Sequence, residues 1–317
     1  KTKIILKGII QRKTARLFTK VLAATLRPKG LEKILCSLCV YPTLCQFFKL
    51  GSLAYAYAAQ LEGKPVRKAQ FKDYTLYIHL KEPWGVRSYF FRESGAFPII
   101  QKILQQGDIF IDAGANIGQF SSKAASILGP QGKVFAFEPE PNNRLLLNKT
   151  VAENQWEGQV KVSSSALWKE TGHTLKFYPS QNPENTGTAS LIQHGIYQDK
   201  SQFVQVKTVT LDDFFENEQI EFCRLMKIDV ERGEDELLEG FSNNLKKQTT
   251  DFILIEMEKD GAAQDLLTRY GYVGFQLLPE NRLEPIGSQA NSVVNDFLFA
   301  SQAKVEEVRQ LQECLRS

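Results

Sequence analysis

Cysteine is scarce in this chain, and its pattern excludes a disulfide-stabilised scaffold. The 317 residues contain five cysteines, an odd number at low density, whereas small secreted domains that depend on disulfides carry many, in even numbers. The sequence therefore predicts a conventional hydrophobic core and a reducing, cytoplasmic setting. Cys36 and Cys39 have the spacing of a metal or redox pair, but no second cysteine pair or histidine lies near them, which favours small buried thiols.

Long apolar runs are missing as well. A membrane-spanning helix needs about 18 or more consecutive apolar residues; no stretch reaches that length, and no signal peptide is evident. Acidic residues are absent from residues 1–31, which contain nine Lys and Arg. Two interpretations of residues 1–62 stay open: helices with a solvated basic face, or a peripheral contact with an anionic membrane or acidic partner. The net charge of +3 is too small to indicate a nucleic-acid partner.

A glycine is missing where a dinucleotide-binding loop would need one. Residues 107–118 resemble a short buried strand that runs into a tight turn, and the turn contains Gly114, Asn116 and Gly118. The nicotinamide dinucleotide fingerprint is G-x-G-x-x-G, so Asn116 replaces its middle glycine and Gln119 its last. A pyrophosphate needs close backbone approach at the helix N-terminus, and Asn116 carries a side chain into that space. The loop therefore suits an adenosine ligand without a pyrophosphate, such as S-adenosylmethionine.

Two carboxylates are present at the ends of apolar strands. Glu138 follows a strand of Val, Phe and Ala, where a carboxylate is costly unless it is paired; a bidentate contact with two ribose hydroxyls would pair it. Asp112 closes the strand ahead of the glycine turn. We expect it to place the amino-acid end of the cofactor, with a cap on the turn as the alternative.

From Ile109 onward, strand-length apolar runs alternate with helical segments, which predicts an α/β fold with a doubly wound, mostly parallel sheet. An inserted hairpin is expected at residues 175–178 and 203–210. Ligands of such sheets bind beyond the carboxyl ends of the strands, where Asp112, Glu138, Ala166 and Asp229 fall. Ser165 and Ala166 are expected to line the adenine edge or simply to pack. The strands are expected at residues 109–112, 134–137, 160–166, 225–230, 252–257, 272–278 and 296–300.

The segment Lys227-Ile-Asp-Val-Glu231 places three charged residues on one side of a core strand. Buried like charges carry raised pKa values or neutralise a cation. Three interpretations stay open: a salt-bridged strand end, Asp229 orienting or deprotonating a hydroxyl beside the reacting group, or Asp229 and Glu231 holding a divalent ion. His173 and His194, in the polar insertion, are the alternative bases.

Five motifs, in this order and spacing, resemble the FkbM family of S-adenosylmethionine-dependent methyltransferases. The resemblance covers roughly residues 93–300. The motifs are G-D-x-x-x-D-x-G-A-N-I-G at 107–118, V-x-A-F-E-P at 134–139, T-x-T-L-D-D at 208–213, K-I-D-V-E at 227–231 and L-I-E at 254–256.

The resemblance implies a class I methyltransferase fold, Rossmann-like, with a seven-stranded sheet whose last strand is antiparallel. It implies a methyltransferase domain at residues 93–302 and methyl transfer to oxygen. Outside the match, the residue pattern itself predicts a helical and short-strand extension at 1–92 and a capping helix at 303–317, with an oligomer contact of that helix as the alternative; its apolar residues are Val305, Val308, Leu311 and Leu315. The cofactor residues would be Asp112, Gly114, Asn116, Gly118 and Glu138, joined by Ser165 and Ala166 from their place on the third strand; the catalytic residues facing the acceptor would be Lys227, Asp229 and Glu231.

The sequence departs from the family pattern at Arg232. The family usually continues K-I-D-V-E with a glycine, and here an arginine stands in that place, followed by Gly233. An arginine adds a cation on the acceptor side, where it would pair with Glu231 or Glu234 or bind an anionic acceptor. It also calls the backbone geometry of this turn into question.

The function expected from these observations is an S-adenosylmethionine-dependent O-methyltransferase that acts on a hydroxyl of a glycan, glycolipid or small natural product. Two alternatives remain. One is an N-methyltransferase of the same fold, since a carboxylate beside the methyl group suits an amine equally well. The other is a non-catalytic scaffold tethered by the basic N-terminal segment.

Overall fold

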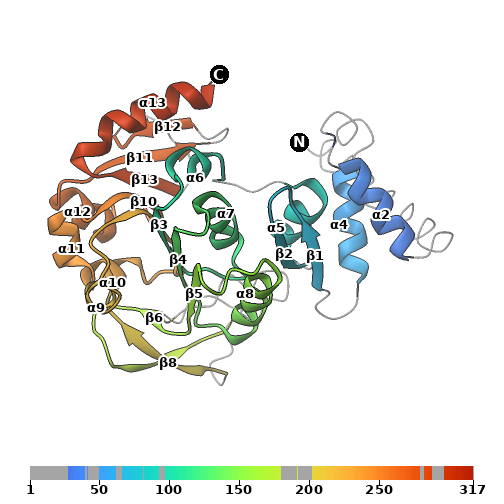
Figure 1. Cartoon of the computed structure of the whole chain (residues 1–317), viewed down its shortest axis with the longest axis horizontal. Coiled ribbons are helices and arrows are strands. Elements are labelled where there is room, and N and C mark those ends of the chain that lie inside the picture. Colours follow the sequence, from blue (N-terminus) through green and yellow to red (C-terminus); the bar gives the residue numbers. More distant parts are fainter. Residues whose placement is uncertain are drawn as a thin grey trace, which may run out of the picture. The chain divides into compact units, whose positions relative to one another are not determined.

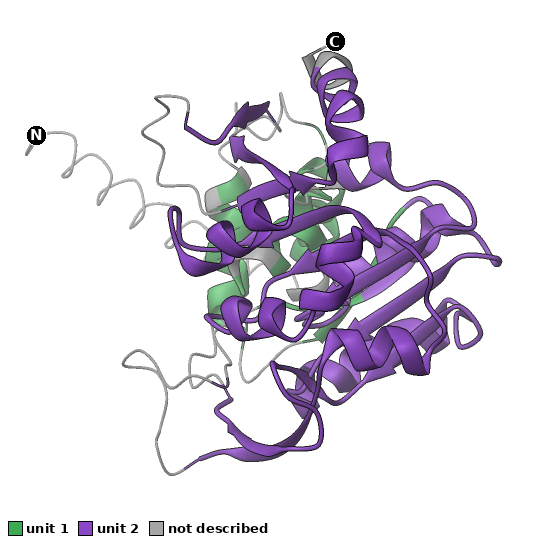
Figure 2. Ribbon diagram, turned by 90° about the vertical axis from the view of Figure 1, so that its left-hand side faces the viewer, with its two compact units in different colours: residues 1–71, 77–94, 183–185 green, residues 72–76, 95–182, 186–317 purple. Residues whose placement is uncertain are grey.

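The computed structural model describes most of the chain, which divides into two compact units (Figure 2). The first unit comprises Lys1–Phe71, Tyr77–Ser94 and Pro183–Asn185, and the second comprises Lys72–Leu76, Gly95–Asn182 and Thr186–Ser317. The described residues are 28–39, 41, 50–61, 66–80, 82–92, 97–179, 191, 202–278, 282–287 and 296–316.

The first unit is built around a buried carboxylate. Glu32 accepts hydrogen bonds from the hydroxyls of Tyr57 and Tyr89 and from Arg67 Nε at 2.7 Å. Burial alone would raise the pKa of Glu32, but these donors outweigh burial and lower it. The network ties together elements that are far apart in sequence. They are α2 (Pro28–Cys39), α4 (Leu50–Gln60), β1 (Val66–Gln70) and the π-helix Arg87–Phe91; β2 (Thr75–His79) pairs with β1, and α5 is Pro83–Val86.

The second unit contains the central sheet (Figure 1). Its strand order is β12-β11-β13-β10-β9-β3-β4-β5. The five strands from β10 to β5 are parallel, whereas β13 is antiparallel to both of its neighbours. The strands are β3 (Ile109–Ala113), β4 (Lys133–Phe137), β5 (Val160–Ser163), β9 (Cys223–Ile228), β10 (Thr250–Glu256), β11 (Val273–Leu278), β12 (Arg282–Pro285) and β13 (Asp296–Ala300).

The predicted doubly wound, mostly parallel sheet is confirmed, with two corrections. The sheet has an eighth strand, β12, at its edge beside β11. The third strand ends at Ser163 rather than at residue 166, and Ala166 instead begins β6 (Ala166–Leu167). β6 pairs with β8 (Val204–Val209), which also pairs with β7 (Thr174–Phe177) as the expected hairpin.

Helices cover both faces of the sheet because successive strand residues point to opposite sides. Phe110 and Leu225 belong to one core cluster, and their neighbours Ile111 and Met226 belong to the other. We call the first side the α7 face. The α7 face packs against α6 (Phe97–Ile103), α7 (Gln119–Leu128), α8 (Pro141–Glu153) and α13 (Val305–Arg316); the other face packs against α9 (Leu211–Asn217), α10 (Glu234–Glu239), α11 (Ser242–Lys247) and α12 (Ala262–Arg269).

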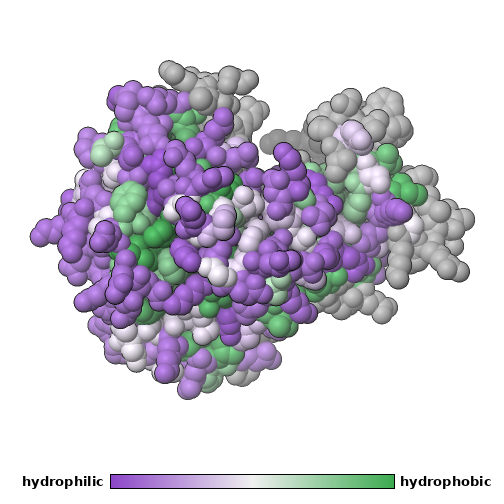
Figure 3. Space-filling view, in the orientation of Figure 1, coloured by the Kyte–Doolittle hydropathy of each residue, from purple (hydrophilic) through white to green (hydrophobic). Residues whose placement is uncertain are grey.

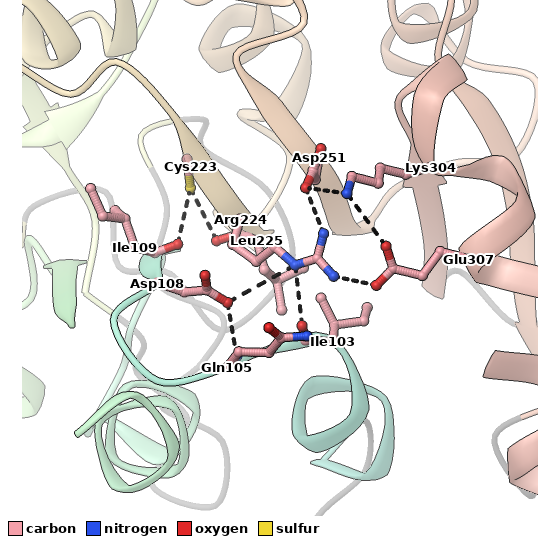
Figure 4. A network of polar contacts seen from close by, with 10 residues as sticks. All are labelled: Ile103, Gln105, Asp108, Ile109, Cys223, Arg224, Leu225, Asp251, Lys304 and Glu307. Atoms are coloured by element: carbon pink, nitrogen blue, oxygen red, sulfur yellow. Dashed lines mark hydrogen bonds and ion pairs between the residues drawn. The ribbon is translucent and has the colours of Figure 1, made fainter. Parts of the chain in front are cut away.

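An ionic network holds the C-terminal helix to the amino edge of the sheet (Figure 4). Arg224, near the start of β9, pairs with Asp251 of β10 at 2.6 Å and with Glu307 of α13. Its Nε donates to the carbonyl of Ile103 at 3.2 Å. Lys304 lies 3.5 Å from Asp251 and 3.6 Å from Glu307. α13 is thus the capping helix that its apolar spacing predicts, and it is fixed at the edge opposite the strand ends that carry the site.

The surface of the described residues carries apolar side chains in separate places. Leu145, Phe203 and Phe222 are exposed, each on a different segment, and the face drawn in Figure 3 is mainly hydrophilic. Among the described helices, none has the length and apolar character needed to cross a membrane. Cys39 is buried and Cys36 half-buried, both as free thiols. Residues 1–27 lie outside the described part, so the membrane contact of residues 1–62 stays a prediction.

Candidate active site

Strand register brings Asp112 and Lys227 together on the α7 face. Asp112 of β3 pairs with Lys227 of β9 on one side and with Ala136 of β4 on the other. Directly opposed residues of neighbouring strands project to the same face. Because Ala136 lies in the core of the α7 face, the Asp112 and Lys227 side chains project there too.

Three acidic residues lie side by side at the edge of the sheet where the parallel strands have their carboxyl ends. Glu256 is opposed to Asp296 on β13. Ile255 is opposed to Ile228, so Glu256 lies beside Asp229. Glu138 follows β4 two residues after Ala136 and therefore also projects to the α7 face. We call Asp229, Glu256 and Asp296 the carboxylate row. The prediction that Asp112, Glu138 and Asp229 meet at one edge agrees with this arrangement.

Asp112 is fully buried and has an unused oxygen. Its Oδ2 accepts a hydrogen bond from Ser121 Oγ of α7 at 2.6 Å. Its Oδ1 is buried and has no partner in the part of the chain that the structure describes. Burial raises the pKa of Asp112, and the Lys227 ammonium opposes that rise. A buried carboxylate oxygen without a donor is costly, so this position fits a ligand that brings a positive donor.

Glu138 is buried and only partly satisfied by the chain. Its Oε2 accepts from the backbone N–H of Asn116, and its Oε1 from that of Glu140, both at 2.7 Å. Burial raises the pKa of Glu138 to about 8, and the nearby Glu140 carboxylate adds to the rise. Each carboxylate oxygen has two acceptor sites. One therefore remains on each oxygen for a pair of ligand hydroxyls.

The turn glycines are required by the packing of the chain itself. Gly114 has φ 79°, and a Cβ there would lie 1.8 Å from the carbonyl oxygen of Asp229. Gly118 has φ 87°, and its Cβ would lie 2.2 Å from Leu147 Cδ1. Packing within the chain therefore requires glycine at both positions, in addition to the close approach of a ligand that the sequence pattern suggests. Asn116, at φ 51°, accepts the N–H of Ile117 on its own side-chain oxygen at 2.8 Å, which removes a donor that a pyrophosphate would need.

Lys227 is a buried cation that fixes Asp229. Its Nζ lies 2.9 Å from Asp229 Oδ2 and 3.5 Å from the carbonyl of Gly114, and it sits 4.8 Å from the ring centre of Phe120. Burial acts to lower the pKa of Lys227, but Asp229 and Asp112 outweigh it and raise the pKa. The salt-bridged strand end is therefore present, and it orients Asp229.

Like charges crowd the carboxylate row. Burial raises the pKa of Glu256 to about 7, with Asp229 and Asp296 adding to the rise. Burial raises the pKa of Glu231 to about 8, with Asp229 and Glu256 adding. The pKa values of Asp296 and Glu234 are raised by burial and by Asp229. This edge therefore holds carboxyl groups that exchange protons near neutral pH, which is what proton transfer to or from a bound group requires.

Sequence reasoning missed Glu256, Asp296 and Glu234 as site residues. The signal for Glu256 was present, because it ends a buried strand just as Asp229 does. Asp296 gives no such signal, since it begins its strand. It reaches the carboxyl edge only because β13 runs antiparallel to its neighbours.

Comparison with known proteins identifies the family to which this chain belongs. Residues 112–276 match the methyltransferase FkbM domain. The chain belongs to the FkbM methyltransferase family. It is 29% identical over 183 residues to the hexuronic acid methyltransferase AglP of Haloferax volcanii, covering 56% of this chain and 67% of that protein. It is 26% identical over 200 residues to the 31-O-demethyl-FK506 methyltransferase FkbM of Streptomyces tacrolimicus, covering 56% and 76%.

The solved structures that resemble this FkbM chain are distant in sequence. A methyltransferase FkbM from Methylobacillus flagellatus KT is 13% identical with a TM-score of 0.40, covering 88% of this chain and 60% of that one. Fibrillarin from Aeropyrum pernix, whose structure contains S-adenosyl-L-methionine, is 11% identical with a TM-score of 0.36, covering 76% and 84%.

The cofactor of this FkbM methyltransferase is S-adenosylmethionine, and the residues fit it. The unused Asp112 Oδ1 suits the ammonium of its amino-acid end, and the free acceptor sites of Glu138 suit two ribose hydroxyls. When bound, the cofactor supplies a methyl group already activated on a sulfonium. The individual residue roles stay predictions.

A divalent ion does not fit Asp229 and Glu231. The Lys227 ammonium already occupies Asp229 at 2.9 Å. Across the described residues, no group of three or more His, Cys, Asp and Glu side chains is placed to hold a metal. The metal interpretation of this pair therefore gains no support from the arrangement.

Arg232, which stands where the family usually has a glycine, adopts a backbone conformation that favours glycine. Its φ is 76°, and Glu231 before it has φ 57°, so two successive side-chain-bearing residues adopt the left-handed region. Arg232 is exposed, and its guanidinium forms no ion pair within the described residues. The expected pairing with Glu234 is not formed, and Glu234 instead accepts the N–H of Val230 at 3.1 Å.

Ser165 and Ala166 were expected either to line the adenine edge or simply to pack, and the structure shows packing for Ala166. Ala166 packs its side chain against Phe177 and Val206. The Ser165 N–H donates to Ser163 Oγ at 3.1 Å, and the Ser163 carbonyl accepts from Glu138 at 3.0 Å. The segment is therefore adjacent to Glu138, and its adenine role stays a prediction.

His173 and one family motif contact residues outside the site. His173 is exposed and its Nε2 lies 3.0 Å from Glu170, while His194 lies outside the described residues. In T-x-T-L-D-D, Thr210 caps α9 by accepting the N–H of Asp213. Asp212 accepts the N–H groups of Asn243 and Asn244 at 3.0 Å. This motif is structural.

Proposed function

We propose that this chain is an O-methyltransferase that methylates a hydroxyl of a glycan, glycolipid or small natural product. The carboxylate row carries this proposal. It lies on the same face and at the same edge as Asp112 and Glu138, so an acceptor bound there is next to the cofactor. Carboxylates accept hydrogen bonds from hydroxyls and take their protons.

The chain's own contribution is placement. Lys227 holds Asp229 in one orientation, so that Asp229 can accept a hydrogen bond from the acceptor hydroxyl. Gly114 allows the Asp229 backbone to approach the cofactor turn. Holding two reactants in line converts a bimolecular reaction into an effectively unimolecular one. Alignment of oxygen and methyl is therefore the main task of these residues.

An acidic sugar is the acceptor that we favour. AglP is named for a hexuronic acid, and Arg232 offers an exposed guanidinium three residues beyond Asp229 and one beyond Glu231. A guanidinium binds a carboxylate through two parallel hydrogen bonds. The hydroxyl to be methylated would then contact the carboxylate row while the sugar acid contacts Arg232.

An N-methyltransferase is the second candidate, because the carboxylate row would attract an ammonium group. A matched acceptor panel separates the two: methyl β-D-glucuronoside, methyl β-D-glucoside and methyl β-D-glucosaminide. Methylated oxygen, identified by mass spectrometry and NMR, supports the proposal. Transfer to the amine alone replaces it with the second candidate.

Calorimetric titration with S-adenosylmethionine, and separately with NAD, tests the premise. We expect binding of the former and none of the latter. Binding of neither would favour the non-catalytic scaffold tethered by residues 1–62.

A further inference from the structure

The three members of the carboxylate row differ in what they already contact. Asp229 is paired with the buried Lys227 ammonium at 2.9 Å. This contact holds the Asp229 carboxylate in one orientation, so Asp229 is well suited to orient a hydroxyl.

Glu256 occupies the middle of the row. It lies between Asp229 of the adjacent parallel strand end and Asp296 of the antiparallel β13. Glu256 is partly open to solvent at the strand end, and it forms no ion pair or hydrogen bond among the described residues. Two flanking carboxylates disfavour a third charge between them, so taking up a proton relieves Glu256 of that repulsion.

We propose that Glu256 is the general base that takes the proton of the acceptor hydroxyl, while Asp229 orients that hydroxyl. This inference rests on the proposed O-methyltransferase function. The hydroxyl gives its proton to a Glu256 oxygen while the hydroxyl oxygen forms its bond to the methyl carbon. The electron pair of the broken carbon–sulfur bond stays on sulfur. The products are a methyl ether, a neutral Glu256 and S-adenosylhomocysteine.

The electrostatic surroundings of Glu256 agree with this role. Burial raises its pKa to about 7, which is near the operating pH of an efficient base. Lys227 opposes the rise without cancelling it. The charged groups that face Glu256 come from β9, the turn after it, α10 and β13; they are Lys227, Asp229, Glu231, Glu234 and Asp296.

The test compares Glu256→Gln with Glu231→Gln, whose carboxyl also has a raised pKa. With methyl β-D-glucuronoside or methyl β-D-glucoside as acceptor, we expect Glu256→Gln to lower kcat on the order of 10²- to 10⁴-fold. We also expect it to remove the rise of kcat/KM with pH near 7, with S-adenosylhomocysteine affinity unchanged. If Glu231→Gln loses the rise of kcat/KM with pH while Glu256→Gln retains it, the assignment of Glu256 as the base is overturned.

A second measurement needs neither cofactor nor acceptor. The folded-state pKa of Glu256 is above its unfolded value near 4.3, so its contribution to stability is fully present below about pH 4.3 and is lost as pH rises through about 7. Glu256→Gln should therefore raise the melting temperature relative to wild type, and by more at pH 8.5 than at pH 5. Glu216→Gln, which changes an exposed carboxylate of α9, is the matched control. A difference that does not change with pH overturns the proposal.

These readouts separate two failures. If calorimetry shows no S-adenosylmethionine binding while the stability difference appears, the proposed function fails and the unusual titration of Glu256 stands. If the cofactor binds and wild type methylates an acceptor while Glu256→Gln is as active, the base assignment alone fails.

Discussion

At the scale of single residues, the site is a set of buried carboxylates with different amounts of hydrogen bonding. Asp112 has one oxygen satisfied by Ser121 and one left over, whereas Glu138 has each oxygen half satisfied by backbone N–H groups. A bound ligand would donate hydrogen bonds to these unoccupied acceptor sites. The strength of cofactor binding should therefore depend on these two carboxylates more than on the glycines beside them.

Replacing Glu138 with alanine should weaken cofactor binding. A hydrogen bond to a charged group contributes about 1.5–3 kcal/mol, so we expect the dissociation constant for S-adenosylmethionine to rise about 30- to 150-fold at a loss of about 2–3 kcal/mol. Isothermal titration calorimetry measures it. Glu157→Ala, an exposed carboxylate after α8, serves as the control, and equal constants for both variants would refute the ribose contact.

Replacing Arg232 with glycine should stabilise the fold. The left-handed conformation costs a side-chain-bearing residue about 1–2 kcal/mol, and glycine avoids that cost while losing some of the gain through its unfolded-state entropy. We expect a net gain of up to about 1 kcal/mol by urea denaturation. Arg232→Ala keeps the Cβ and should show no such gain. If both variants gain equally, side-chain charge rather than backbone strain is responsible.

At the scale of elements, the sequence predicts the strands that carry the site because each is a buried, mainly apolar run with a carboxylate at or just beyond its end. Asp112 is the last residue but one of Ile109–Ala113, and Asp229 follows Cys223–Ile228. β12 escapes prediction because only one of its four residues, Leu283, is buried. The end of the third strand is misplaced because Val160–Leu167 contains two strands of different sheets, and local pattern does not encode which partner a strand chooses.

The site is predicted less completely than the fold. Asp112, Glu138 and Asp229 follow from their positions at strand ends. The ion pair between Lys227 and Asp229, and the arrival of Asp296 beside Glu256, depend on register and strand direction. Register and strand direction depend on residues that are far apart in the sequence, so the spacing within one motif does not predict them.

Removing Arg224 should loosen the C-terminal helix. Breaking a buried ion pair by deleting one partner costs about 3–5 kcal/mol because the other charge stays buried, and Asp251 would keep only its longer contact with Lys304, at 3.5 Å. We expect Arg224→Met to lower the free energy of unfolding by about this amount in urea. Arg309→Met, which removes an exposed pair on the same helix, should cost less than about 1 kcal/mol. Equal losses would show that the network is no stronger than a surface pair.

At the scale of the whole molecule, the chain combines a methyltransferase unit with a unit organised around Glu32. The basic residues concentrate at the start of the sequence, since residues 1–31 contain nine Lys and Arg and no acidic residue. Polybasic segments bind anionic lipid surfaces with about 1 kcal/mol per basic residue. This supports a peripheral membrane role that the described residues leave untested.

Deleting residues 1–27 should abolish binding to anionic vesicles while leaving the described helix α2 in place. We expect the full chain to co-sediment with phosphatidylserine vesicles at low salt and to dissociate as salt is added. Phosphatidylcholine vesicles are the control. Equal sedimentation of the full and shortened chains would place any lipid contact elsewhere.

The amino and carboxyl ends of the central strands carry different groups of polar residues. The amino edge bears the Arg224 network, and the carboxyl edge bears Asp112, Glu138 and the carboxylate row. If the proposed function holds, the residues that secure the fold and the residues that contact an acceptor are therefore different residues, at opposite ends of the same strands. Related proteins can therefore change their acceptor by mutations at the carboxyl ends of the strands, while the Arg224 network that stabilises the fold at the amino ends stays unchanged.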